Sequence, residues 1–187
     1  MRRRNRFHDS SSGGRVTKEK IPLYVWLVTC AIAVMHACYY YPQLPAVVAS
    51  HYGPSGNPDA WSGKQEFATF QFLIIGFVAV FFTVLPYVVS LVPVSLINLP
   101  NKEYWLAPER RTDTLRFFRY YPLWFASATM LLIIDVFHQV FLVNMGKEKA
   151  LGHPAWSIAL YMVFSVAWAA GLFLRFRKPS SSVASRN

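Results

Sequence analysis

The stretch FATFQFLIIGFVAVFFTVLPYVVSLVPVSLI, residues 67–97, decides how many times this chain crosses a membrane. It is an apolar run of 31 residues, whereas one helical crossing of a hydrocarbon core takes about 20 residues. The run is therefore too short for two crossings and too long for one upright crossing. Pro86 and Pro93 lie in its last third, where proline kinks or ends a helix. The pattern predicts one span over about 67–90, followed by a bent or interfacial exit.

Three further apolar runs flank this stretch, at about 21–41, 121–143 and 154–174. Hydrophobic residues make up 54% of the chain, and mean hydropathy is +0.27. Because these side chains are gathered into runs of membrane-crossing length, they indicate a lipid solvent rather than a large soluble core. The sequence predicts an all-α integral membrane protein, a four-helix transmembrane bundle over residues 21–176. Residues 1–20 and 177–187 are polar, and we expect them to be disordered tails.

The positive charges are unevenly divided among the segments that join the spans. With both ends inside, 16 of the 19 Lys and Arg residues lie in inner segments, and only Lys64, Lys147 and Lys149 lie in outer loops. Since cytoplasmic loops carry excess Lys and Arg, this division predicts cytoplasmic N- and C-termini. It also predicts an outer loop at 42–66 and an inner interfacial segment at 98–119. Membrane topology then explains the net charge of +10, and we expect no nucleic-acid partner.

The chain carries no sequence motif of a familiar catalytic chemistry. A nucleophile elbow, a Walker loop, a Cys-x-x-Cys pair and a His-Glu-x-x-His helix are all missing from the sequence. The sequence therefore predicts a non-enzymatic protein with no cofactor and no bound metal. An intramembrane enzyme ranks last among the functional hypotheses.

The third predicted span carries polar residues well inside its apolar run. Asp135, His138 and Gln139 lie at i, i+3 and i+4, so they share one helix face. A charge at this depth costs about 2.5–3.5 kcal/mol, so this face should meet protein or water rather than lipid. His36 of the first span lies at similar depth, which allows an Asp135–His36 or an Asp135–His138 contact. The group is either a proton- or cation-responsive cluster or a hydrogen bond between packed helices, with Asp135 neutral.

The predicted outer loop, residues 42–66, contains three turn dipeptides near its middle. His51, Asp59 and Lys64 of this loop could bind a peptide, a metal or one another. The alternative is that the loop is a rigid cap on the bundle. Two candidate ligands in a turn, His51 and Asp59, do not make a zinc site.

Several residues of this loop occur in a spaced pattern. They are Leu44, Pro45, Val48, His51, Tyr52, Gly56, Pro58, Asp59 and Lys64. Here the sequence resembles a bacterial membrane domain of unknown function, which forms the N-terminal part of SdpI-type immunity proteins and reads approximately LP-x-x-IP-x-H-(F/Y)-x-x-x-G-x-(P)-D-x-x-x-x-K. The resemblance covers about residues 25–90. It implies a stand-alone four-span member of that group, located in the bacterial cell (inner) membrane.

The predicted inner segment combines aromatic and basic residues. Pro108 is well placed to open a short surface helix that carries Leu115, Phe117 and Phe118. We expect this segment either to anchor at the membrane interface, with its arginines on lipid phosphates, or to dock a cytosolic partner. The candidate anchor residues are Asn98, Tyr104, Trp105, Arg110 and Arg111.

The favoured hypothesis is a non-enzymatic sensor or protective, immunity-like membrane protein that recognises an extracytoplasmic peptide or protein through the 42–66 loop. The resemblance makes immunity one version of it, although SdpI-type proteins carry a second membrane domain whose Gly-x-Arg-Thr motif is absent from this chain. The alternative is a small proton- or cation-coupled transport component that uses the Asp135 group. In both cases the lipid bilayer surrounds the spans.

Overall fold

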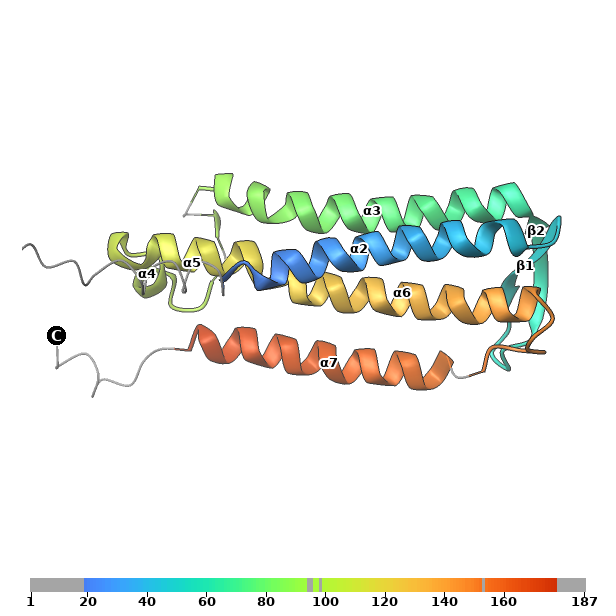
Figure 1. Cartoon of the computed structure of the whole chain (residues 1–187). Helices are drawn as coiled ribbons and strands as arrows, with labels where there is room; N and C mark the ends of the chain where they lie inside the picture. The colour runs from blue at the N-terminus through green and yellow to red at the C-terminus, as the bar shows by residue number, and fades with distance from the viewer. Residues whose placement is uncertain (1–18, 94–95, 98, 153, 178–187) are drawn as a thin grey trace, which may run out of the picture.

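The computed structural model describes residues 19–93, 96–97, 99–152 and 154–177. Four long helices run in alternating directions (Figure 1): α2 (Ile21–Tyr40), α3 (Lys64–Leu91), α6 (Pro122–Asn144) and α7 (Pro154–Arg175). All four are long and apolar enough to cross a membrane. The chain therefore has the architecture of a multi-pass membrane protein, as its hydropathy predicts. The two expected disordered tails lie almost entirely outside the described residues.

The long second apolar stretch forms one helix, α3. Pro86 lies inside this helix, which ends at Leu91, two residues before Pro93. A proline removes one i→i−4 hydrogen bond, and α3 absorbs that loss at Pro86. The helix also begins at Lys64, three residues earlier than the sequence predicts.

Between α2 and α3, where the sequence predicts an outer loop in an all-α fold, the structure forms a β-hairpin. A 3-10 turn, η1 (Tyr41–Gln43), leads into two antiparallel strands, β1 (Val47–Tyr52) and β2 (Pro58–Gly63). A hydrogen bond from the Gly53 N–H to the Asn57 carbonyl, 2.9 Å long, closes the turn between them. The hairpin escaped prediction because its burial does not alternate along either strand, so the sequence lacks the period of two that marks a strand.

At the opposite end of the bundle lie two short helices, α4 (Lys102–Trp105) and α5 (Pro108–Tyr120) (Figure 1). The short helix predicted to begin at Pro108 is confirmed. We call this end, with the start of α2 and the end of α7, the tail end. The end that carries β1 and β2 is the hairpin end.

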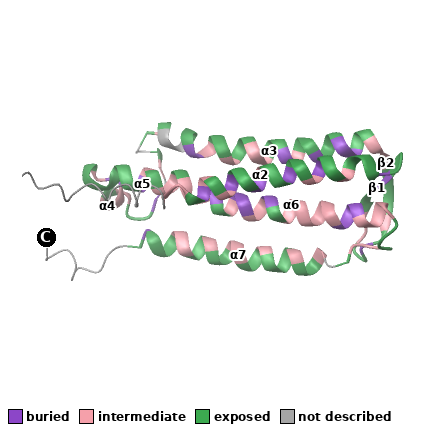
Figure 2. Cartoon of the chain, in the orientation of Figure 1, coloured by how far each residue is buried: buried purple, intermediate pink, exposed green. Residues whose placement is uncertain are grey.

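The main core lies between α2, α3 and α6, whose facing sides carry the buried residues (Figure 2). Small residues of this core allow the helix backbones to approach closely, as in many membrane bundles. The core consists of Trp26, Ala33, Ala37, Ile75, Leu123, Ala126 and Met130. A second buried cluster, around Val48 and Phe141, lies under the hairpin, and a third surrounds Phe176 at the tail end.

Helix α7 is attached differently, because none of its residues is buried. In lipid, apolar contact between helices gains little over contact with acyl chains, so hydrogen bonds matter more. Two such bonds join α7 to α6: Ser157 donates to Asp135 (2.6 Å), and Tyr161 pairs with Thr129 (2.9 Å). Just before α6, the Tyr121 hydroxyl donates to the carbonyl of Trp168 (2.9 Å), and Trp168 Nε1 donates to the Tyr121 carbonyl (3.4 Å).

Gly171 of α7 lets the Tyr121 side chain lie close to the helix. A Cβ atom added at Gly171 would lie 2.7 Å from Tyr121 Oη, whereas one added at Gly76 of α3 would meet nothing within 4 Å. We expect Gly171→Ala to displace the hydroxyl and to lose its hydrogen bond to Trp168, at a cost of about 1 kcal/mol. Gly76→Ala is the matched control, because both changes raise helix propensity equally. Thermal unfolding in detergent measures the difference, and equal midpoints for the two variants would contradict the prediction.

Candidate functional site

The hairpin is fastened to the bundle by Asn144, the last residue of α6. Its Oδ1 accepts a hydrogen bond from the Ala49 N–H (2.7 Å), and its Nδ2 donates to the Ala49 carbonyl (3.1 Å). One side-chain amide thus satisfies the same two backbone groups that a neighbouring strand would. Its Nδ2 also donates to the hydroxyl of Tyr52, 3.3 Å away. Asn144 therefore fixes β1 against the end of α6.

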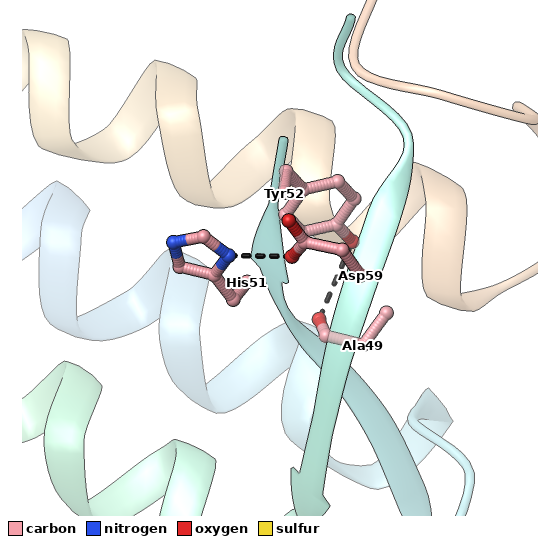
Figure 3. A network of polar contacts seen from close by, with 4 residues as sticks. All are labelled: Ala49, His51, Tyr52 and Asp59. Carbon is pink, nitrogen blue, oxygen red and sulfur yellow. Dashed lines mark hydrogen bonds and ion pairs between the residues drawn. The ribbon is translucent and has the colours of Figure 1, made fainter. Parts of the chain in front are cut away.

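Two side chains of β1, Val48 and Tyr52, pack against the helices. Val48 is fully buried, and Tyr52 packs half-buried against the same cluster as Phe67 and Phe141. The Tyr52 hydroxyl donates to the Ala49 carbonyl at 3.3 Å (Figure 3). Burial raises the pKa of Tyr52 to about 12, although the hydrogen bond from Asn144 acts in the opposite direction.

Two further contacts hold the base and the tip of the hairpin. At the base, Lys64 Nζ donates to the carbonyls of Leu44 (2.9 Å) and Pro42 (3.4 Å). At the tip, Gly56 has a φ of +76°, which favours glycine. The buried Gly56 accepts a hydrogen bond from the Leu151 N–H (2.9 Å), and a Cβ added there would lie 3.1 Å from the Leu151 carbonyl oxygen. The hairpin is thus held at both of its ends and along β1.

His51 and Asp59 form the most exposed polar pair of the hairpin, with Nδ1 of His51 2.5 Å from Oδ1 of Asp59 (Figure 3). Their side chains are 70% and 50% exposed. His51 is aligned with Ala60, and the register shifts on both sides of His51 leave Ser50 and Asp59 without a partner. In a regular strand Asp59 and Ala60 would point to opposite faces. The irregular register turns Asp59 toward His51, as bulges do beside functional sites.

Beside this pair lies a cavity of about 340 Å³ between the hairpin, α3 and α6. Most of its lining is apolar, and Phe70 at its wall is 60% exposed, so the cavity opens to the surface of the bundle. His51, Ser50 and Tyr52 supply its polar groups. An apolar cavity with a few polar groups at one side is the usual form of a ligand site.

Residues 28–77 match the family described as Domain of unknown function (DUF1648). The match covers most of α2, the whole hairpin and the first half of α3. It confirms the resemblance to a domain of unknown function in this part of the chain. Comparison with curated proteins finds no match, and comparison with solved structures finds none either.

The hairpin separates the residues of the predicted loop motif into two groups. Most of them build the hairpin: Leu44 is buried, Lys64 holds the base, Gly56 holds the tip and Pro58 begins β2. His51 and Asp59 bind each other, as the sequence allows, and Lys64 does not join them. Pro45 is exposed.

The intramembrane polar group divides into two separate contacts, and Asp135 forms a hydrogen bond between packed helices, one of the two alternatives that the sequence leaves open. The Asp135 carboxylate accepts hydrogen bonds from Gln139 (2.8 Å) and Ser157 (2.6 Å). His36 Nε2 lies instead 3.3 Å from His138 Nδ1, so the two imidazoles pair with each other. The physical reason is that α7 presents a hydroxyl directly to Asp135. Neither of the Asp135–His contacts that the sequence allows forms.

At the tail end, the indole N–H of the candidate anchor residue Trp105 binds another part of the chain. It donates to the carbonyl of Phe176 (3.1 Å), and Asn101 Nδ2 donates to the same oxygen (3.1 Å). Thr114 in turn donates to the Trp105 carbonyl (2.8 Å). These bonds satisfy a carbonyl just after the end of α7, where a helix leaves such groups without partners.

The remaining candidate anchor residues are arranged along α4 and α5. The guanidinium of Arg110 lies 4.1 Å from the centre of the Tyr104 ring, and Arg111 is exposed. Asn98 lies outside the described residues. Anchoring of these residues to lipid phosphates stays a prediction.

The sequence did not indicate two residues that make key hydrogen bonds: Asn144, which binds the hairpin, and Ser157, which binds Asp135. Asn144 stands at the end of an apolar run, where an amide commonly ends a helix and gives no hint of a distant strand. Ser157 lies four residues before Tyr161, and both bond to α6. That i, i+4 spacing of hydroxyls in an otherwise apolar helix was the available signal.

Replacing Asn144 should loosen the hairpin while the helices remain folded. In Asn144→Ala the Ala49 N–H and carbonyl lose both hydrogen bonds, at about 1 kcal/mol each. Asn144→Asp keeps an acceptor for the N–H but has no donor for the carbonyl, so its effect should be intermediate. Hydrogen exchange of the β1 amides measures the change, with the α2 amides as the internal reference. Unchanged exchange in Asn144→Ala would contradict the role of this residue.

Tyr52 should make the hairpin sensitive to high pH. Its pKa is raised from 10.0 to about 12 in the folded protein, so the folded state holds the proton more tightly than the unfolded state. This contribution to stability is fully present below pH 10 and is lost as the pH rises through about 12. Tyrosinate absorbance, measured as the difference between wild type and Tyr52→Phe, should show one group titrating near pH 12. A difference spectrum that titrates near pH 10 would contradict the prediction.

Proposed function

We propose that this chain is a non-enzymatic membrane protein that binds an extracytoplasmic ligand through its hairpin. The observation that carries the proposal is the exposed His51–Asp59 pair on a hairpin that other residues hold in place. Asn144, Lys64 and Gly56 already fix β1 and the ends of the hairpin. The exposed pair is therefore available for recognition. A site that is ordered before binding loses less entropy when the ligand arrives.

The cavity beside the pair indicates the chemistry of the ligand. Its mostly apolar lining suits a hydrophobic group, while His51 at the wall offers a polar contact. Asp59, hydrogen-bonded to His51, adds an acceptor for a cationic group. An amphipathic peptide with an apolar side chain next to a basic one fits both features. Immunity to a membrane-active peptide is one version of this function, and sensing of such a peptide is another.

The charge distribution supports the proposed orientation. Lys20, Lys102, Arg116 and Arg175 all lie at the tail end, whereas the hairpin end carries few basic residues. By the positive-inside tendency, the tail end faces the cytoplasm and the hairpin faces outward. We propose the bacterial cell membrane as the location, in keeping with the resemblance to a bacterial membrane domain.

The alternative function, proton- or cation-coupled transport, has narrower support. An intramembrane carboxylate and a neighbouring pair of histidines favour it, since such residues mark ion pathways in many transporters. The Asp135 carboxylate, however, accepts hydrogen bonds from Gln139 and Ser157, and this explains its presence as a contact between α6 and α7. A pH-dependent flux in liposomes that Asp135→Asn abolishes would decide for transport.

The proposed binding function is tested with the purified full chain in lipid nanodiscs. Peptides from the culture medium of the source cells are captured, identified by mass spectrometry, synthesised and bound again. We expect His51→Ala/Asp59→Ala to weaken the binding of the synthetic peptide at least about tenfold, because it removes charge-assisted contacts. Lys147→Ala, an exposed change at the same end, is the matched control and should bind as wild type does. Equal binding by all three proteins would overturn the proposal.

A further inference from the structure

A second cavity, of about 430 Å³, lies at the tail end between the start of α2, the α5–α6 junction and the end of α7. It is far from the hairpin and has a different character, because charged and aromatic side chains share its lining. The residues that matter are Glu19, Asp113, Arg116, Arg175, Tyr120 and Trp124. Two carboxylates and two guanidiniums make the cavity formally neutral.

Of the two guanidiniums in this cavity, only that of Arg116 is paired with carboxylates in the described residues. Arg116 Nη1 lies 3.2 Å from the carboxylate of Glu19 and 3.8 Å from that of Asp113. Arg175 forms no ion pair with any carboxylate in the described part of the chain. Its guanidinium lies instead over the ring of Trp105, 4.7 Å from the ring centre. This stacking holds the guanidinium in place and leaves its N–H donors available to an anion.

The position of the cavity along the helices indicates its depth in the membrane. Helix α2 begins at Ile21 and α7 ends at Arg175, so the cavity lies where two apolar spans end. Trp124, 39% exposed, and Tyr120 line it at this level. Trp and Tyr are enriched at the depth of lipid headgroups on both sides of a membrane. The cavity therefore opens at headgroup depth, whichever side the tail end faces.

We propose that this cavity binds the headgroup of a zwitterionic phospholipid, with the phosphate against Arg175 and the ammonium against Glu19 and Asp113. Arg175 comes from α7 and Asp113 from α5, whereas Glu19 lies two residues before the start of α2. A headgroup with one charge of each sign fits between them. Phosphatidylethanolamine meets this description and offers N–H donors to the carboxylates. Arg116 offsets one of the two carboxylate charges, so the wall formed by Glu19, Asp113 and Arg116 keeps one net negative charge for the ammonium. Phosphatidylglycerol brings a negative charge and no ammonium, so this wall disfavours it.

The proposal is independent of the ligand at the hairpin, and native mass spectrometry of the full chain tests it. The protein, freed of lipid in detergent, receives phosphatidylethanolamine and phosphatidylglycerol in equal amounts. We expect wild type to retain phosphatidylethanolamine preferentially. Arg175→Gln should lower this retention about tenfold, the loss of a charge-assisted contact. Arg177→Gln, an exposed arginine outside the cavity, is the matched control and should change nothing.

A second variant tests the other wall of the cavity and does not depend on Arg175. Glu19→Gln/Asp113→Asn should shift the preference severalfold toward phosphatidylglycerol, because it removes the two negative charges. Retention that is the same in wild type, Arg175→Gln and Glu19→Gln/Asp113→Asn would overturn the proposal. Inorganic phosphate that binds in an Arg175-dependent manner and displaces the lipid would assign the site to free phosphate, which also overturns the lipid proposal. Thermal unfolding of each variant shows that the proteins compared are folded.

Discussion

In a hydrocarbon solvent, hydrogen bonds decide where the elements of this protein lie, because apolar contact between helices competes with equally apolar lipid. Helix α7 shows the consequence, since it has no buried residue and is joined to α6 by hydroxyl groups. The hairpin lies beyond the ends of the spans, and there Asn144 of α6 pairs with the backbone of Ala49 above the apolar cluster around Val48 and Phe141. Helix α6 contacts α2, α3, α7 and β1. It is therefore the element on which the positions of the others depend.

This arrangement separates the residues that build the hairpin from those that remain exposed on it. Burial of Val48 and the hydrogen bonds of Asn144 and Lys64 fix the backbone of the hairpin. The exposed His51 and Asp59 are therefore not required to hold the hairpin in place. The irregular register that turns Asp59 toward His51 is local to the hairpin. A change at either residue should therefore leave the bundle intact. The same separation supports the proposed binding function of the hairpin.

A feature could be predicted from the sequence when it depends on residues close together in the chain, and it could not when it depends on residues far apart. Apolar run length alone indicates four spanning helices, and it indicated one helix rather than two around Pro86. The hairpin was missed because burial does not alternate along its strands: the adjacent Val48 and Ala49 are both buried, and Ala49 is bonded by Asn144, which is distant in sequence. The sequence allowed a hydrogen bond between packed helices at Asp135, but it could not name the partner: the i, i+3 spacing places His138 on the same face, whereas the hydroxyl that bonds Asp135 is Ser157 of α7. The motif residues were found, whereas their division into building and exposed groups required the structure.

The satisfied polar groups of α6 also bear on the choice between binding and transport. A charge in the bilayer interior costs about 2.5–3.5 kcal/mol, and Asp135 offsets this cost with two hydrogen-bond donors. A transport route from Asp135 toward the tail end would need further polar groups open to an ion. The next hydroxyls in that direction, of Thr129 and Ser127, donate to carbonyls of their own helix, and that of Thr129 also pairs with Tyr161 of α7. In the described residues the polar contacts of α6 therefore resemble links between helices more than a pathway, which favours recognition at the hairpin as the function.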